Sequence, residues 1–134
     1  CPGITDGAFG FHLYLFQQKH KDFRVDVVKD FGNIILRYGR DDKKGIIALG
    51  GSISKHHALL ATLLNGGADY VVYMTTAALN SGSMGGATAE EAKSWGKVKD
   101  DSDAATVRGD VSINFPLAMI YAFEKLDEKG LLEK

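Results

Sequence analysis

Residues 91–97 hold the side chains of this sequence that could do the most specific chemistry. The segment carries a carboxylate at Glu91, the single tryptophan of the 134-residue chain at Trp95, and a lysine at Lys97. A flat aromatic face beside a carboxylate suits a small cation, through cation–π contact and ion pairing. Lys97 could be a structural charge or a covalent nucleophile, and these two interpretations lead to different functions.

A glycine pair and a histidine pair could contribute to the same or another site. Gly50 and Gly51 could let the backbone approach a phosphate or a ring, although a glycine pair is also typical of a simple turn. His56 and His57 could be metal ligands, but neighbouring side chains on a helix point about 100° apart. No cysteine or aspartate cluster completes a metal site there. A catalytic or hydrogen-bonding histidine therefore fits better, and no metal is expected.

Thr76 and Asp110 each have a structural and a functional interpretation. Thr76 could cap a turn or hydrogen-bond a cofactor. Asp110 could hold ribose hydroxyls or cap the helix that follows it. A lysine at the end of a helix, such as Lys97, is usually a solvated charge that interacts favourably with the helix dipole. The pattern alone leaves these alternatives open.

The elements that must position these side chains alternate between strands and helices. Short apolar or β-branched runs predict strands, and apolar residues at helical spacing predict helices. A capping box formed by Thr88 and Glu91 marks one helix start, and Pro116 marks another because proline is tolerated in a first helical turn. The predicted strands are residues 45–50, 70–74 and 105–109, and the predicted helices are 11–18, 25–35, 55–64, one starting at 88, and 114–129.

This order predicts an α/β fold, Rossmann-like, with a mostly parallel sheet and helices on both faces. In such sheets, ligands bind outside the carboxyl ends of the strands. The glycine and histidine pairs follow the first strand, Thr76 and the segment ending in Lys97 follow the second, and Asp110 follows the third. We therefore expect all these residues at one edge of the sheet.

Composition is that of an ordinary globular domain. The chain has 134 residues, 45% of them hydrophobic, and a formal net charge of −1. No basic stripe indicates nucleic-acid binding, and no apolar run reaches the roughly 18 residues of a membrane span. The single cysteine excludes an internal disulfide, and no secretory signal pattern is visible. We expect a cytoplasmic protein that binds neither nucleic acid nor membrane.

Together these motifs resemble the deoxyhypusine synthase family over nearly the whole chain. The Ser-Trp-Gly-Lys run at 94–97 is the most specific part of the resemblance. The other matching segments are residues 5–7, 50–51, 55–57, 65–70, 76–77, 82–83, 90–93, 110 and 115–117. The resemblance implies an NAD-dependent transferase. Such an enzyme moves the aminobutyl group of spermidine, through an imine on a lysine, to a lysine of the translation initiation factor 5A precursor.

The resemblance also implies roles for individual residues. Lys97 would be the nucleophile, which must react as the uncharged amine, and His56 would carry protons and contact the amine. Trp95 would pack on the polyamine, and Glu91 would pair with one of its ammonium groups. The positions that match NAD contacts of the family are Asp6, Gly51, Thr76, Ala77, Asp110 and Val111, and those that match its substrate loop are Gly82 and Ser83.

The chain departs from the family pattern in its length. Family members are more than about twice as long as this chain of 134 residues, and Cys1 falls within a loop of the family pattern. Residues 1–134 are therefore predicted to be a single domain portion, the downstream half of an NAD-binding α/β domain, completed by a chain with the N-terminal half. Autocleavage, a split gene or excision at Cys1 could each produce the break. Because the family forms tetramers, we expect a tetramer-like assembly of such pairs.

A second departure concerns charge. Phe11, Ser81 and Met84 stand where the family commonly has acids that bind the polyamine. Each buried ammonium group needs a partner, so these replacements should weaken or change amine recognition. Three explanations compete. The substrate is a different amine, as in homospermidine-forming relatives; the missing chain supplies the acids; or the protein is a non-catalytic regulatory subunit.

Overall fold

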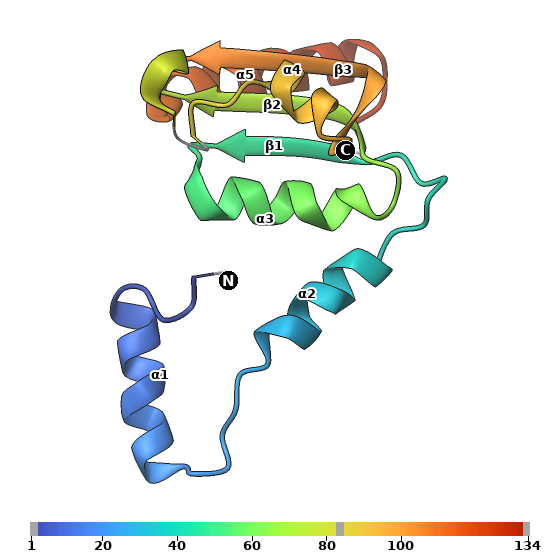
Figure 1. Ribbon diagram of the computed structural model, residues 1–134. Coiled ribbons are helices and arrows are strands. Elements are labelled where there is room, and N and C mark those ends of the chain that lie inside the picture. Colours follow the sequence, from blue (N-terminus) through green and yellow to red (C-terminus); the bar gives the residue numbers. More distant parts are fainter. Residues whose placement is uncertain (1–2, 83–84, 133–134) are drawn as a thin grey trace.

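The computed structural model describes residues 3–82 and 85–132, and its elements follow the order that the sequence predicts (Figure 1). The elements are α1 (Ala8–Lys19), α2 (Val27–Leu36), β1 (Gly45–Leu49), α3 (Ser52–Leu63), β2 (Ala68–Thr75), the short 3-10 helix η1 (Leu79–Ser81), α4 (Ala89–Ser94), β3 (Val98–Arg108) and α5 (Val111–Glu128). Within these residues, no helix is both long and apolar enough to cross a membrane.

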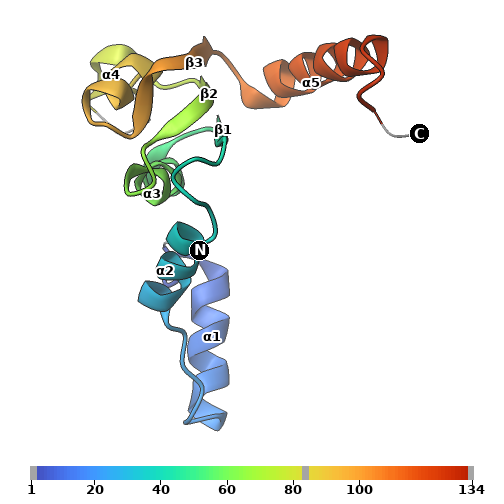
Figure 2. The ribbon, with the colours of Figure 1, turned by 90° about the vertical axis from the view of Figure 1, so that its right-hand side faces the viewer.

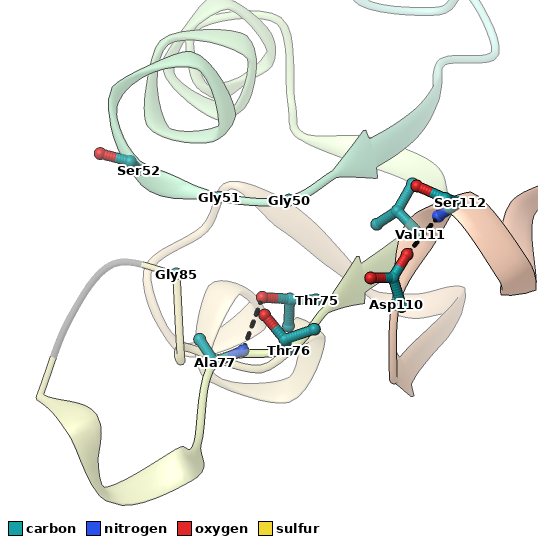
Figure 3. A pocket seen from close by; sticks show the side chains of 10 residues that line it. All are labelled: Gly50, Gly51, Ser52, Thr75, Thr76, Ala77, Gly85, Asp110, Val111 and Ser112. Carbon is teal, nitrogen blue, oxygen red and sulfur yellow. Dashed lines mark hydrogen bonds between the residues drawn. The ribbon is translucent and has the colours of Figure 1, made fainter.

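The strands form one parallel sheet in the order β1-β2-β3, and their carboxyl ends lie side by side at the edge drawn in Figure 3. The predicted α/β class, with a parallel sheet flanked by helices, is confirmed. β3 is longer than predicted because it starts at Val98, before the polar run at 100–103. These residues belong to an edge strand, where outward side chains reach water and polar character does not prevent strand pairing.

One face of the sheet is closed by α3 and α4. Val71 and Tyr73 of β2 are 1% and 0% exposed. They belong to one core cluster with Leu59 of α3 and Ala92 of α4. Small residues on α4 let this short helix lie close to the sheet. The core therefore fixes the distance between α3 and α4, which carry the most specific candidate residues.

The other face of the sheet is open. α5 begins where β3 ends and runs away from the sheet (Figure 2), and Ile47, Leu49 and Tyr70 are exposed. The helices α1 and α2 also extend away from the sheet, and neither contains a buried residue. α2 touches α3 where the rings of Phe31 and His57 lie 4.7 Å apart. The fold thus presents extensive apolar surface to further packing.

The predicted start of the last helix near residue 114 is wrong. α5 begins at Val111, because the Asp110 carboxylate accepts a hydrogen bond of 2.7 Å from the Ser112 N–H and caps the helix there. Pro116 consequently lies inside the helix, where it lacks the N–H of a regular backbone hydrogen bond. The proline was visible in the sequence, but the stronger start signal was the aspartate six residues before it.

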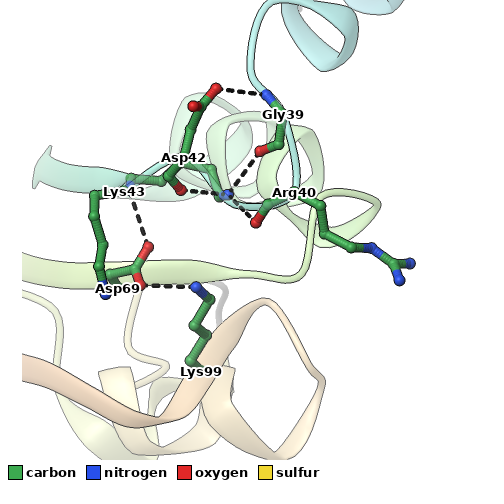
Figure 4. Close-up of polar contacts among 7 residues, drawn as sticks. Gly39, Arg40, Asp42, Lys43, Asp69 and Lys99 are labelled. Carbon is green, nitrogen blue, oxygen red and sulfur yellow. Dashed lines mark hydrogen bonds and ion pairs between the residues drawn. The ribbon is translucent and has the colours of Figure 1, made fainter.

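Asp69 joins the amino ends of the strands (Figure 4). Its carboxylate pairs with Lys99 Nζ at 2.7 Å and Lys43 Nζ at 3.2 Å, and it accepts a hydrogen bond from the Lys44 N–H at 3.0 Å. The Lys99 ammonium and the Lys44 N–H hold the pKa of the Asp69 carboxyl well below its usual range. The Lys44 side chain is buried, and its ammonium donates to the carbonyl oxygens of residues 39, 40 and 42.

Asp69→Asn should remove these ion pairs and lower the unfolding temperature. Because the folded-state pKa lies below the ordinary 3.8, the carboxylate stabilises the fold above about pH 4, and this contribution is lost as the pH falls further. Thermal unfolding of parent and variant from about pH 3 to about pH 7 measures the effect. The gap between the two curves should narrow as the pH falls below about 4, and a gap that does not change with pH contradicts the assignment.

Candidate functional site

A pocket of about 620 Å³ opens at the carboxyl ends of the strands (Figure 3). Its lining comes from the loops after each strand and from the first turns of α3 and α5. The lining residues are Gly50, Gly51, Ser52, Thr75, Thr76, Ala77, Gly85, Asp110, Val111 and Ser112. The structure thus brings together five predicted cofactor residues, namely Gly51, Thr76, Ala77, Asp110 and Val111.

Close backbone contact shapes one wall of this pocket. A Cβ atom at Gly51 would lie 2.5 Å from the Gly85 Cα, so only glycine lets these two loops meet. Ser52, the first residue of α3, has a φ of 68°, a left-handed conformation that is strained for serine. Among the residues that the structure describes, no side chain caps α3, so its first N–H groups are available to a ligand. Such a wall suits a phosphate-bearing molecule.

Two polar side chains of the pocket, Thr75 and Asp110, accept hydrogen bonds from nearby backbone N–H groups, whereas Thr76 is exposed. Thr75 Oγ1 accepts a hydrogen bond of 3.1 Å from the Ala77 N–H and so fixes the turn after β2. Thr76, for which a turn cap was one of two interpretations, is exposed at the pocket instead. Asp110 caps α5, as its structural interpretation predicts. That role does not decide whether it also contacts a ribose.

Gly51→Ala should push the 85–88 loop away from α3. The added methyl group overlaps the Gly85 backbone, and overpacking of this kind costs about 1–3 kcal/mol of unfolding free energy. Chemical denaturation measures the loss. Gly32→Ala is the matched control, because nothing lies within 4 Å of a Cβ at Gly32 in α2. The control should gain stability by up to about 1 kcal/mol, and an equal gain for Gly51→Ala would refute the contact.

A second group of predicted residues lies between α3 and α4. Lys97 is 8% exposed, and its Nζ is 3.5 Å from His56 Nδ1 and 4.6 Å from the centre of the Trp95 ring. The expectation that all candidates share the carboxyl edge is wrong for Lys97. This residue directly precedes β3, and its carbonyl accepts a hydrogen bond from the Ala68 N–H at the start of β2. The side chain, not the backbone, brings its amine to His56.

His56 is placed to exchange a proton with the Lys97 amine. Burial first, and then the charges of Lys97 and His57, lower the pKa of His56 below 6.5. The imidazole is therefore neutral at pH 7, where one ring nitrogen can accept a hydrogen bond. Trp95 is 50% exposed and offers an aromatic surface beside the buried amine. The arrangement combines a proton acceptor, an amine and a cation-binding ring.

Glu91 forms part of the capping box at the start of α4. Thr88 Oγ1 accepts a hydrogen bond of 3.2 Å from the Glu91 N–H, and the Glu91 carboxylate accepts one of 2.8 Å from the Thr88 N–H. The predicted capping box is therefore confirmed. The same carboxylate also acts electrostatically on Lys55 of α3. Glu91 thus combines a capping role at the start of α4 with a charge near Lys55.

The remaining predicted residues lie away from both groups or outside the described chain. Asp6 is exposed in the loop before α1 and does not line the pocket. Phe11 is 58% exposed on α1. Gly82 follows η1 with a φ of 62°. Ser83, Met84 and the side chain of Ser81 lie outside the described residues.

Sequence reasoning gave no role to Lys55, Gly85 or Ser112, which the structure places at or between the two groups. Lys55 is 5% exposed. A lysine in the first turn of a helix is usually solvated, and nothing local marks this one as buried. Gly85 lies in a glycine-rich loop whose approach to Gly51 is a long-range contact. Its position next to a pocket could not be read from spacing.

Lys97→Met should raise the midpoint of the His56 titration, because it removes a neighbouring positive charge that opposes protonation of the imidazole. In the parent protein, this midpoint should lie below 6.5. NMR titration of the histidine ring protons measures both values, and His56→Asn identifies the resonance. A midpoint that falls in the variant would disprove the electrostatic contact.

The fold and these two groups define an α/β protein that holds a buried lysine–histidine pair near a glycine-walled pocket. A family model described as deoxyhypusine synthase matches residues 1–122 of this chain. The chain belongs to the deoxyhypusine synthase family.

Individual relatives agree with this family assignment. A probable deoxyhypusine synthase of Methanopyrus kandleri is 41% identical over 125 residues, which cover 93% of this chain and 42% of the relative. A deoxyhypusine synthase of Candida glabrata is 41% identical over 92% of this chain and 32% of the relative. That of Neurospora crassa is 40% identical over 95% of this chain and 36% of the relative. The chain therefore spans less than half the length of these relatives.

Proposed function

We propose that the protein containing this chain forms deoxyhypusine, by NAD-dependent transfer of the aminobutyl group of spermidine to a lysine of the initiation factor 5A precursor. The observation that carries the proposal is the buried Lys97, with its Nζ 3.5 Å from His56 Nδ1 and beside the Trp95 ring. A buried amine with a neutral base at hand is suited to imine formation, which needs the uncharged amine. Family membership supports the same reaction.

Individual residues of this chain have separate roles in the proposed transfer. Lys97 attacks the oxidised carbon of the aminobutyl group, and the aminopropyl amine leaves as this carbon becomes an imine on Lys97. His56 accepts the proton that Lys97 loses. Trp95 packs against the methylene chain and the cationic end of the substrate, and Glu91 pairs with an ammonium group. Gly82 and Ser83, which match the substrate loop of the family pattern, would contact the amine.

NAD fits the pocket at the carboxyl ends of the strands. A Cβ at Gly51 would overlap the Gly85 backbone in the wall, and the start of α3, which no described side chain caps, faces the same space. Thr76, Ala77, Asp110 and Val111 would hold the remaining polar groups of the dinucleotide. When bound, NAD supplies the hydride acceptor for the amine and the hydride donor for the final imine. Asp6 would contact it only if the loop before α1 were repositioned or came from a neighbouring chain.

The open face of the sheet supports a partner that completes the fold. Ile47, Leu49 and Tyr70 are exposed there, and the chain spans 42% or less of the relatives described above. We infer that a chain or segment with the N-terminal half of the family fold covers this face. A tetramer-like assembly of such units follows from the family. A cytoplasmic location would give the enzyme access to its protein acceptor.

Phe11, Ser81 and Met84 favour a second candidate, transfer to a small amine as in homospermidine formation. These positions carry no charge, so this chain offers fewer partners for a triamine than the family pattern does. A non-catalytic subunit is the weaker alternative, since Lys97 and His56 keep the contact that catalysis would use.

Incubation of the complete assembly with NAD and aminobutyl-labelled spermidine, followed by borohydride reduction, should place label on Lys97. Imine formation requires this amine, so Lys97→Ala should lose the label, at least about a hundredfold. Lys93→Ala is the matched control from the same segment and should keep it. Peptide mass spectrometry locates the label.

The acceptor decides between the candidates. Label that moves to the initiation factor 5A precursor supports deoxyhypusine formation, whereas label that moves only to a free diamine supports the homospermidine-type reaction. Absence of label on Lys97 in the parent assembly eliminates both reactions and leaves a non-catalytic role.

A further inference from the structure

Lys55 is a buried lysine between the pocket and the Lys97–His56 pair. It lies in the first turns of α3, directly before His56, and is 5% exposed. Its Nζ donates a hydrogen bond of 2.6 Å to the carbonyl oxygen of Ala87 and lies 4.0 Å from the centre of the Tyr73 ring. One ammonium group thus reaches from α3 across the core face of the sheet to the loop before α4.

The loop that Lys55 holds connects the two candidate sites. Gly85, two residues before Ala87, lines the pocket and touches Gly51. Thr88, the residue after Ala87, caps α4 together with Glu91. Residues 85–88 therefore line the pocket at one end. At the other end they lead into α4, which carries Glu91 and is followed by Trp95.

Lys55 also acts on Glu91 electrostatically. Burial lowers the pKa of Lys55, and the Glu91 carboxylate opposes this shift, so the two charges lie close enough to attract each other. This attraction adds to the hydrogen bond from Lys55 to the Ala87 carbonyl, which holds the loop before α4 to α3, the helix that carries His56. Because Glu91 also accepts the Thr88 N–H, its position is set from two sides.

We propose that Lys55 is a positioning residue that braces residues 85–91 against α3, and so fixes Glu91 relative to the Lys97–His56 pair. The inference rests on the proposed function, because it assigns Glu91 to the amine substrate. Lys55 touches neither the amine nor the cofactor in this role. Its removal lets the loop move, which weakens amine binding and slows capture of the amine on Lys97.

Lys55→Met in the complete assembly tests this role, since methionine keeps much of the side-chain volume without the charge or the donor. The KM for spermidine should rise, and the rate of borohydride-trapped label on Lys97 should fall, each about tenfold, as for loss of one charged hydrogen bond. Lys55→Arg keeps a cation and N–H donors and should recover most of both values.

Lys44→Met is the matched control. Lys44 is also 5% exposed and also donates to backbone carbonyls, but it lies just before β1 at the amino ends of the strands. It should cost a similar amount of stability and leave the KM and the trapping rate unchanged. Equal kinetic effects of Lys44→Met and Lys55→Met, or an unchanged KM in Lys55→Met, overturn the proposal.

Hydrogen–deuterium exchange tests the brace without any reaction. Lys55→Met should speed exchange in residues 85–94, and Lys44→Met should speed it near residues 39–44 instead. If the parent assembly traps no label, the proposed function fails, and the exchange pattern alone decides the brace. Unchanged protection of residues 85–94 in Lys55→Met contradicts it.

Discussion

The packing of α3 and α4 on one face of the parallel sheet is the constraint on which both candidate sites depend. Tyr73 and Val71 fix the depth at which the two helices lie. α3 begins at the pocket and carries His56 one turn further on, while α4 leads directly to Lys97. A shift of either helix on the sheet would change the pocket wall and the lysine–histidine contact together. The two sites therefore depend on the same packing, although the pocket lies at the carboxyl ends of the strands and Lys97 directly precedes the amino end of β3.

Three lysines are buried in the described part of the chain, and each has a different chemical environment. Lys44 Nζ donates hydrogen bonds to three backbone carbonyl oxygens, which suits a structural role. Lys55 combines a carbonyl oxygen with an aromatic ring and a nearby carboxylate, which suits a brace. Lys97 faces a histidine with a lowered pKa and the ring of Trp95. Burial alone does not distinguish these three lysines; the neighbours of each ammonium or amine group do.

One face of the sheet is not covered by the helices that the structure describes. This agrees with the finding that the chain spans less than half the length of the relatives described above. An α/β sheet of this kind normally buries both faces, because its strands are apolar on both sides. Here α5 turns away, and Ile47, Leu49 and Tyr70 are exposed. The two helices α1 and α2 contain no buried residue. Apolar surface on this scale is characteristic of an interface.

The sequence by itself determined the α/β order, the strand cores, the capping box at Thr88 and the family, because these depend on local periodicity, capping chemistry and a specific motif around Trp95. It also placed Gly51, Thr76 and Asp110 at one edge, since parallel strands bring their following loops together. It could not show that Lys97 precedes a strand whose polar residues 100–103 conceal its start, nor that Asp110 rather than Pro116 begins α5. Only the tertiary structure decided that Lys97 meets His56, that Gly51 meets Gly85 and that Lys55 is buried. Each of these is a contact between segments far apart in the chain, and its geometry depends on how deeply two helices pack on the same sheet.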